Sequence, residues 1–481
     1  MSLVPFVHPE TKADLQAMHD LLAAAGLSFW LVRHAWGVAV AVADSSPGAG
    51  AAEHAIHQLA RPGGLRRAEA VPGVARVGLS ADPGRWVEVE RWTIGPLLVT
   101  CPRANALTRE QFDAADMEPA VVELFGRQWP TLAGMFGAHP GDVGFDVDVV
   151  FSWVDGSDPV LSSARARWRA HVVLGEGDGA AARTRQIDEL RYALRSVYQN
   201  APWVRRIFIA TDSRLPGWLA ADHPRVTVVR SAEHFADPGA LPTFNSHAVE
   251  SQLHHIEGLA EHFVYCNDDM FIGRPVAPSM FFSAAGISRF IESPVRIGGG
   301  AVSIGRSGHE NAARNNRRLL ASRFGCVITR HLAHAPAPLR RSVLAELEAE
   351  FPVDFAATAA SRFRSATDIS VTNSLYHYYA LLTGRAVPRE SARARYVETT
   401  SAAGLAELAE LAERPDADFF CLNDGGTPEV DDAHRAATVS GFLARYFPYP
   451  APWEADRAGH RPRAADWSRP GTAGLAGRAS G

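Results

Sequence analysis

Several features are scarce or missing in this chain of 481 residues, and each absence excludes a class of protein. Only four cysteines occur and none forms a C-x-x-C pair, so the sequence predicts neither a cysteine-based zinc site nor a dense disulfide framework. No window contains the roughly 18 apolar residues of a membrane-spanning helix, and no basic segment followed by an apolar run opens the chain. We therefore expect a cytoplasmic protein without an integral membrane segment, and peripheral association with the inner face of the membrane stays an open alternative.

Lys12 is the only lysine in the chain, so apart from it the basic residues other than histidine are all arginines. The formal net charge of -5 gives no overall attraction to nucleic acid, so we expect no nucleic-acid partner, although a local group of arginines could still bind phosphate. With 47% hydrophobic and 21% charged residues, the composition is that of a globular protein. The length exceeds what one hydrophobic core usually reaches, which predicts more than one structural region.

The pattern of apolar residues divides the chain into three regions. Residues 1–140 predict a small α+β appendage, and no constellation of catalytic residue types precedes Asp146. Residues 141–450 alternate strand-like and helix-like segments, which is typical of an open α/β sheet with flanking helices. Residues 451–481 are rich in Pro, Gly, Ala and Arg without an apolar period, and we expect a disordered tail there.

Local patterns predict the elements of the first two regions. In the appendage we expect a helix at 12–24, a turn at 45–50 and strands at 28–33, 36–43, 86–90 and 97–101. In the second region we expect strands at 206–211, 225–230 and 262–266, and helices at 186–198, 246–256, 341–351 and 368–383. Between 293 and 330 the abundance of Gly, Asn and Arg predicts a long functional loop with short helices.

One apolar strand ends in three polar residues, Asn267, Asp268 and Asp269. Two adjacent carboxylates offer hard oxygen ligands to Mg²⁺ or Mn²⁺, and such an ion can neutralise a diphosphate. The alternative for an isolated motif of this kind is a solvated acidic turn. The abrupt end of the strand favours the metal site, so we expect Mg²⁺ or Mn²⁺ as a cofactor.

Two further strand-like segments end in polar residues. The first ends in Trp153, Asp155 and Gly156, where the glycine would let the backbone approach a ligand closely. The indole and the carboxylate could then contact a base or a sugar. The second ends in Asn423 and Asp424, which could reach the same metal or substrate. Taken alone, the first motif is also compatible with an ordinary turn.

Residues suited to proton transfer and phosphate binding follow in the last third of the chain. His331 and His334 lie three positions apart, and histidine is the side chain best suited to accept a proton near neutral pH. Arg362 and Arg364 come next, and a guanidinium group can hold a phosphate through two hydrogen bonds. A structural role is commoner for any single histidine, and which of the two would be the base stays open.

Two of the predicted helices carry polar residues at helical spacing. On the first, Arg191 and its charged neighbours are typical of a surface ion-pair ladder, and Arg191 is also a candidate for substrate binding. The second would be capped by Asn245 or Ser246, and it would place Ser246, Glu250 and His254 on one face. This face is a candidate binding surface.

Together and in this order, these motifs resemble the four conserved regions of the Stealth proteins. That family includes bacterial capsule and exopolysaccharide phosphotransferases and the animal enzyme that puts N-acetylglucosamine 1-phosphate on lysosomal glycoproteins. The similar segments are DVVFSWVDGSD, RQIDELRYALRSV through YCNDDMF, HLAHAPAPLRRSVLAELEAEF through RFRSATDIS, and FFCLND. The resemblance spans about residues 146–425 and implies an open, mostly parallel, Rossmann-like sheet of the nucleotide-sugar transferase type.

The resemblance also implies roles for individual residues. Asp155, Asn245, Ser246, Glu250 and His254 would line the donor site, Asp268 and Asp269 would handle metal and phosphate, His334 or His331 would be the base, Arg364 would contact phosphate, and Asp424 would complete the site. The remaining candidates for substrate binding are Trp153, Gly156, Arg191, Asn267, Arg362 and Asn423. Gln186 stands where relatives often carry Asp, and Ala333 where they often carry Pro.

The activity that the resemblance implies is transfer of a hexose 1-phosphate or N-acetylhexosamine 1-phosphate from a UDP-sugar to a carbohydrate hydroxyl. The products would be a phosphodiester and UMP, and the setting capsule or exopolysaccharide synthesis. The alternatives are a conventional metal-dependent glycosyltransferase, which would release UDP, and a carbohydrate-binding subunit without catalytic activity. The expected partners are a nucleotide sugar and a carbohydrate acceptor, and homo-oligomerisation stays open.

Overall fold

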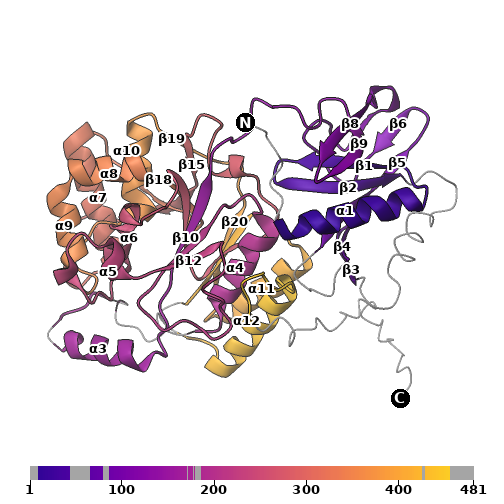
Figure 1. Ribbon diagram of the computed structural model, residues 1–481. Helices are drawn as coiled ribbons and strands as arrows, with labels where there is room; N and C mark the ends of the chain where they lie inside the picture. The colour runs from indigo at the N-terminus through magenta and orange to yellow at the C-terminus, as the bar shows by residue number, and fades with distance from the viewer. Residues whose placement is uncertain are drawn as a thin grey trace, which may run out of the picture.

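The computed structural model describes residues 9–43, 66–79, 86–170, 172–176, 178, 186–424 and 428–455. The predicted turn at 45–50 and the part of the predicted tail from residue 456 onward lie outside the described residues. Figure 1 shows the N-terminal strands and helix α1 gathered on one side of the molecule and the second region on the other. Among the described residues, no helix has both the length and the hydropathy needed to cross a membrane.

The N-terminal region is a mixed sheet with one long helix, as the sequence predicts. Buried apolar side chains of the helix, including Leu15, Met18 and Leu22, pack against strand residues such as Leu31 and Val40. The elements are α1 (Pro9–Ala24), β1 (Phe29–His34), β2 (Gly37–Ala43), β3 (Arg66–Val71), β4 (Val74–Gly78), β5 (Val87–Ile94), β6 (Leu98–Thr100), β7 (Gln111–Asp113) and the hairpin β8 (Pro119–Leu124) and β9 (Arg127–Leu132).

The second region is built on a five-stranded sheet in the order β12-β11-β10-β13-β18. Its strands are β10 (Val147–Ser152), β11 (Ile207–Ala210), β12 (Val226–Val229), β13 (His262–Asn267) and β18 (Ala337–Arg340). The first four pair in parallel and β18 is antiparallel to β13, which confirms the predicted open, mostly parallel sheet. The chain leaves β10 towards β11 on one side and returns to β13 on the other, so the strand order changes direction beside β10. In sheets of this type a ligand site is expected at that position, beyond the carboxyl ends of the strands.

Successive side chains of a strand point to opposite faces of the sheet, and here both faces carry apolar side chains that other elements cover. Val149 and Phe151 of β10 join one apolar core, whereas Val150 between them joins the other. The first face is covered by α4 (Glu189–Asn200), α11 (Ala402–Glu413), α12 (Asp432–Tyr446) and the small sheet of β14 (Met270–Ile272), β20 (Ala394–Glu398) and β21 (Phe419–Asn423). The second face is covered by α7 (Gly308–Phe324), α8 (Arg341–Glu350), α9 (Pro352–Ala360) and α10 (Tyr376–Leu382).

The other elements are α3 (Pro159–Arg169), α5 (Ser231–His234), α6 (Ser246–Glu250) and the strand pairs β15 (Ser288–Phe290) with β19 (Ala386–Pro388) and β16 (Glu292–Arg296) with β17 (Arg330–Leu332).

Three helix predictions need correction. The helix expected at 246–256 ends at Glu250 as α6, and a separate 3₁₀ turn follows at Leu253–His255. The helix expected at 368–383 is regular only as α10, after a wide turn at Val371–Leu375. The loop expected at 293–330 contains α7, a single helix of 17 residues that Ser307 caps at its N-terminus and Gly325 ends in a left-handed conformation.

The surface ion-pair ladder expected around Arg191 is also wrong. Arg191 and Arg195 of α4 are buried, and both donate to the carboxylate of Glu454, with N–O distances of 2.7 Å from each Nε. Trp453, beside Glu454, is fully buried against the same helix. The sequence assigns residues 451–455 to a disordered tail, but this segment is ordered and residues 451–454 are buried.

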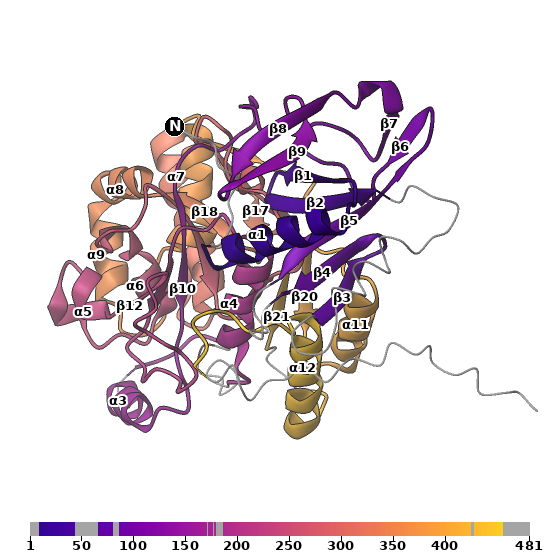
Figure 2. The ribbon, with the colours of Figure 1, turned by 45° about the vertical axis from the view of Figure 1, so that its right-hand side comes forward.

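The N-terminal region contacts the second region through Trp86. The indole of Trp86 meets the ring of Tyr198 on α4 edge-on at 5.5 Å between centroids, and it lies 4.8 Å from the ring of Tyr449. Tyr198 in turn packs against Trp453 at 5.7 Å. Figure 2 shows α1 and the strands that follow it next to α4 and the C-terminal helices.

We predict that Glu454→Ala lowers the free energy of unfolding by about 3–5 kcal/mol, because two guanidinium groups would stay buried without their carboxylate. Urea denaturation followed by tryptophan fluorescence measures this change. Glu410→Ala, on the exposed face of α11, is the control and should change the value by less than about 0.5 kcal/mol. Equal effects of the two substitutions would show that the buried ion pairs contribute nothing.

Candidate functional site

A cavity of about 780 Å³ opens at the carboxyl ends of β10, β11 and β13, and we call it the acid-lined cavity. Its described lining contains eight carboxylates, Asp155, Asp178, Glu189, Asp212, Asp268, Asp269, Glu398 and Asp424. The arginines of the same lining are Arg165, Arg169, Arg364 and Arg435. Carboxylates outnumber arginines two to one, so the cavity is suited to a ligand that brings cations with it.

The turn after β10 forms one wall of the acid-lined cavity. The indole Nε1 of Trp153 donates to Gln186 Oε1 at 3.1 Å, and the amide of Gln186 donates back to the carbonyl of Val154 at 2.7 Å. Asp155 accepts hydrogen bonds from the backbone and the hydroxyl of Ser157. The motif of Trp153, Asp155 and Gly156 therefore forms an ordered turn, and this turn lines the cavity.

The turn after β13 lies beside it, because Ser152 and Asn267 are paired at the ends of the two parallel strands. Asn267 accepts from the hydroxyl of Tyr265 at 2.8 Å. Burial, together with the charges of Asp269 and Glu189, holds the pKa of Asp268 well above its ordinary value. Burial also raises the pKa of Glu189. Raised carboxyl pKa values indicate negative charge that the protein itself does not compensate.

Asp269 provides the test of whether a hard divalent cation fits here. One of its oxygens, Oδ1, is buried without a hydrogen-bond partner, while Oδ2 accepts from the thiol of Cys421 at 3.3 Å. Burial and the charge of Asp269 hold the pKa of Cys421 well above its ordinary value. Asp269, His334 and Cys421 each offer one ligand atom, and these atoms all lie within 4.8 Å of one another. The carboxylate oxygen with no hydrogen-bond partner is the kind of donor that Mg²⁺ or Mn²⁺ prefers.

The two candidate bases are in different surroundings. His334 Nε2 lies 3.7 Å from Asp269 Oδ1, and the His334 ring contacts Tyr396, which lines the cavity. His331 Nε2 instead lies 3.6 Å from a carboxylate oxygen of Glu310 on α7, and burial lowers the pKa of His331. Only His334 is next to the acidic turn after β13.

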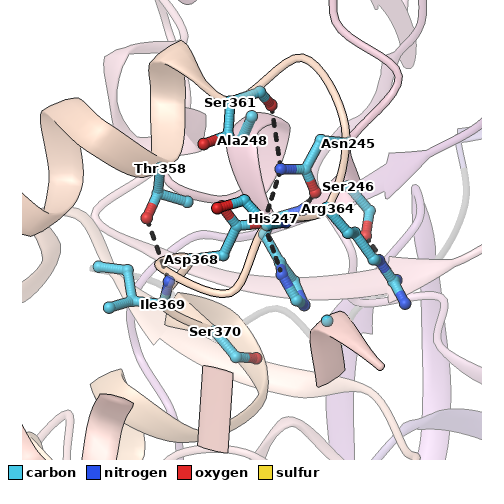
Figure 3. Close-up of polar contacts among 12 residues, drawn as sticks. Asn245, Ser246, His247, Ala248, Thr358, Ser361, Arg364, Asp368, Ile369 and Ser370 are labelled. Atoms are coloured by element: carbon cyan, nitrogen blue, oxygen red, sulfur yellow. Dashed lines mark hydrogen bonds and ion pairs between the residues drawn. The ribbon is translucent and has the colours of Figure 1, made fainter. Parts of the chain in front are cut away.

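Arg364 reaches the acid-lined cavity from the loop after α9. Its Nη2 donates to Ser246 Oγ at 3.0 Å, at the first residue of α6, and its Nη1 lies 3.6 Å from Asp178. Figure 3 shows Arg364 lying along Ser246, with Asn245 directed towards Ser361. The Asn245 amide donates to the Ser361 carbonyl at 3.0 Å.

Asn245 fixes this arrangement from a buried position. Its oxygen accepts from the His247 backbone at the start of α6, and its amide also donates to the Asp368 carboxylate at 2.8 Å. The loop that carries Arg364 is thus tied at both ends to the cap of α6. Asn245 therefore positions both the loop and α6, and it is the N-cap residue that the sequence predicts for this helix.

Asp424, at the end of β21, faces the cavity from the opposite side. Its carboxylate pairs with Arg435 of α12 and accepts from the hydroxyl of Thr399. Asn423 donates to Glu398, another lining residue, at 3.2 Å. The fourth sequence motif therefore lies at the same cavity as the other three.

Four family models match the chain in the order of these motifs. They are described as Stealth protein conserved regions 1 to 4 and match residues 145–172, 183–290, 333–381 and 409–464. The chain belongs to the Stealth family. The resemblance inferred from the sequence is thereby confirmed.

Close relatives of this Stealth protein carry functional names. The chain is 61% identical to an exopolysaccharide phosphotransferase of Nocardia farcinica, over 93% of the chain and 88% of the relative. It is 59% identical to the exopolysaccharide phosphotransferase CpsY of Mycobacterium tuberculosis, over 83% of the chain and 74% of the relative. The Stealth protein described here is accordingly an enzyme, a phosphotransferase.

Similarity to solved structures is distant. The galactosyltransferase LgtC matches with a TM-score of 0.31 and 10% identity, over 65% of this chain and all (100%) of LgtC. The bifunctional glycosyltransferase WbbM matches with a TM-score of 0.32 and 10% identity, over 70% of this chain and 55% of WbbM.

The four Stealth regions meet at the acid-lined cavity. Most of the candidate residues from the sequence line it, namely Trp153, Asp155, Gly156, Asn245, Ser246, Asn267, Asp268, Asp269, Arg364, Asn423 and Asp424. His334 adjoins this group through Asp269, and His331 lies in β17, three residues before His334.

Four candidates for substrate binding lie elsewhere. Arg191 is engaged with Glu454. Glu250 is buried and accepts from the hydroxyl of Thr372 at 2.5 Å, and His254 is hydrogen-bonded to Glu348 of α8 at 2.7 Å. Because α6 ends at Glu250, the shared face of Ser246, Glu250 and His254 does not form. The fourth, Arg362, lines a neighbouring cavity.

Several lining residues have no counterpart among the sequence candidates. Asp212 follows β11 just as Asp155 follows β10, so the rule of polar strand ends would have found it. Glu189 begins α4 and could be recognised only with the helix placed against the sheet. Arg435 sits within α12, where its sequence context gives no signal.

We predict that, in the presence of a chelator, Asp268→Asn raises the melting temperature by a few degrees. In a large domain each kcal/mol of added stability shifts the melting temperature by about 2–4 °C. Because burial raises the pKa of Asp268, the fold loses the stability contribution of the protonated carboxyl as the pH rises above the ordinary value of about 4, and the uncharged amide of asparagine avoids this loss. Differential scanning fluorimetry measures this effect, and Mg²⁺ should stabilise the wild type more than the variant. Asp222→Asn, at an exposed position, should change nothing; a lower melting temperature for Asp268→Asn would contradict the charge argument.

Proposed function

We propose that this enzyme transfers a hexose 1-phosphate or N-acetylhexosamine 1-phosphate from a UDP-sugar to a carbohydrate hydroxyl in exopolysaccharide synthesis. The observation that carries the proposal is the meeting of all four Stealth regions at one cavity, where paired carboxylates, a histidine and an arginine lie together. The names of the relatives support the setting in exopolysaccharide synthesis. The volume of about 780 Å³ suits a nucleotide sugar.

A divalent cation, Mg²⁺ or Mn²⁺, is part of this proposal. Asp268 and Asp269 would hold it, and it would offset the negative charge of the diphosphate. Trp153 offers an aromatic face for the base or the sugar at the edge of the sheet, and Gly156 leaves room for the ligand. Asp155 offers an acceptor for a donor hydroxyl.

The transfer step assigns one role to each of two side chains. His334 takes the proton of the acceptor hydroxyl, whose oxygen bonds to the phosphorus that carries the sugar. The bond from this phosphorus to the bridging oxygen of the diphosphate breaks, and UMP leaves. Arg364 donates to the oxygens of the transferring phosphoryl group and stabilises the charge that develops on them.

Product analysis separates this reaction from the conventional glycosyltransferase. We expect purified protein with Mg²⁺, a panel of UDP-hexoses and an oligosaccharide acceptor to produce UMP and a phosphate-containing sugar, detected by mass spectrometry. Release of UDP with a phosphate-free glycoside would establish the glycosyltransferase instead. No turnover with any donor would favour the non-catalytic subunit.

Asp269→Asn and Arg364→Ala should each keep the fold and lower kcat by about 10²–10³-fold, because each removes charge stabilisation of the transferring group. Circular dichroism checks the fold and UMP release measures the rate. Arg318→Ala is the matched control, because Arg318 is exposed on α7. Near wild-type turnover in either site variant would remove that residue from the mechanism.

The geometry also separates the two candidate bases. His334→Ala should lower kcat by about 10²–10⁴-fold, the usual contribution of a general base. His331→Ala should lower kcat far less, because His331 faces Glu310. The opposite pattern would reassign the base to His331.

A further inference from the structure

A second cavity, of about 540 Å³, adjoins the acid-lined cavity, and we call it the arginine-lined cavity. Its described lining is Trp168, Val172, Val173, Gly175, Asp178, Ile304, Arg306, Gly308 and residues 360–367. The two cavities share Asp178, Phe363 and Arg364. A ligand in the arginine-lined cavity would therefore reach the same guanidinium group that faces the donor.

The two cavities differ in charge. Three arginines line the second, Arg306, Arg362 and Arg364, and Asp178 is its only carboxylate among the described residues. Asp178 is buried, its Oδ2 accepts from the Gly308 backbone and its Oδ1 lies 3.6 Å from Arg364 Nη1, so this carboxylate is paired with one of the three arginines. The acid-lined cavity has the opposite balance, with twice as many carboxylates as arginines.

Arg362 retains its charge in this position. Its Nη2 donates to the carbonyls of Gly239 and Leu241, which fix the side chain without neutralising it. Within the described parts of the chain, neither Arg362 nor Arg306 forms an ion pair with a carboxylate. Two cations therefore remain available to an anionic group of a ligand.

Trp168 adds an apolar surface beside these cations. The guanidinium of Arg362 lies over its indole, 4.2 Å from the ring centroid, and 43% of Trp168 is exposed. Ile304 and Val173 of the same lining are 67% and 76% exposed. An aromatic face with apolar neighbours and hydrogen-bonding groups at its edge is suited to one face of a sugar ring.

We propose that the arginine-lined cavity binds the acceptor, and that the acceptor is a glycan carrying an anionic group that faces Arg306 and Arg362. This inference rests on the proposed transfer, because it assigns the acceptor a place from which its hydroxyl meets the phosphorus beside Arg364. The donor with its cation fits the acidic side, and an acceptor of the opposite charge character fits the basic side. A phosphodiester and a uronic acid carboxylate offer the same chemistry to the two arginines.

The test compares three acceptors that share one neutral oligosaccharide core: the core itself, its methyl phosphodiester, and its uronic acid form. With saturating donor and Mg²⁺, we expect the wild-type enzyme to have an acceptor KM at least ten-fold lower for an anionic form than for the neutral core. Comparing the two anionic forms identifies the group that is preferred. Equal KM values for all three acceptors would overturn the proposal.

Variants locate the effect in the cavity. Arg306→Glu should raise the KM for the anionic acceptors about ten-fold and leave the KM for the neutral core unchanged, and Arg306→Lys should retain most of the preference. Trp168→Ala should raise the KM for all three acceptors. Arg318→Glu, at an exposed position on α7, is the control for charge reversal. An unchanged preference in Arg306→Glu would overturn the assignment.

The same variants distinguish failure of this inference from failure of the proposed transfer. If the enzyme releases UDP instead of UMP, the acceptor KM values still test the cavity. If no turnover occurs, calorimetric titration of the three oligosaccharides replaces the kinetic assay. Binding that depends on Arg306 and Trp168 would then support the acceptor site, and binding that ignores both would overturn it.

Discussion

The parallel pairing of β10 with β13 is the constraint on which the site depends. Ser152 and Asn267 are opposite each other at the last position of the two strands, so the chain leaves both strands at the same edge of the sheet. The turns that follow bring Asp155, Asp268 and Asp269 to one cavity. Because these turns end buried strands, their carboxylates are held near one another and the pKa of Asp268 is raised by burial and by its neighbours. Holding a buried carboxyl of this kind lowers the stability of the fold at neutral pH.

The second half of the site is attached to the first by one buried side chain. Asn245 caps α6 and holds Ser361 and Asp368 in the loop that carries Arg364. This loop is more than a hundred positions away in the sequence. The Asn245 side-chain amide donates to the carbonyls of Ser361 and Phe363 and to the carboxylate of Asp368. These bonds hold the loop so that Arg364 reaches Ser246. A residue of this kind can affect phosphoryl transfer without touching the substrate.

The sequence predicted the sheet because its strands follow from local rules, and several of the candidate side chains line the acid-lined cavity. Strands such as 262–266 are apolar on both faces, and polar residues at their ends identify Asp155, Asp268 and Asp424 without knowledge of the packing. Local rules cannot predict ion pairs between residues that are far apart in the sequence. Arg191 looked like a surface residue because its partner, Glu454, lies in a segment whose composition suggested disorder.

Helix length was the other weak point of the sequence interpretation. A periodic pattern at 246–256 predicted one helix, but α6 ends at Glu250 and a separate 3₁₀ turn follows at Leu253–His255. His254 consequently faces Glu348 on α8, and no periodicity argument could have indicated this partner. Conversely, the Gly- and Asn-rich character of 293–330 hid α7, whose helical residues bury asparagine and arginine side chains.

Tyr198 gives the two distant ends of the described chain a common contact point. Trp86 packs on one side of its ring and Trp453 on another, so residues before β10 and residues after α12 complete the surroundings of a single helix. That helix starts with Glu189 at the cavity. A fragment that begins at the first conserved region would keep Trp453, which lies in the fourth region, but would lose Trp86 from its contact with Tyr198 on α4. A minimal fragment of this enzyme should therefore also retain the N-terminal flank.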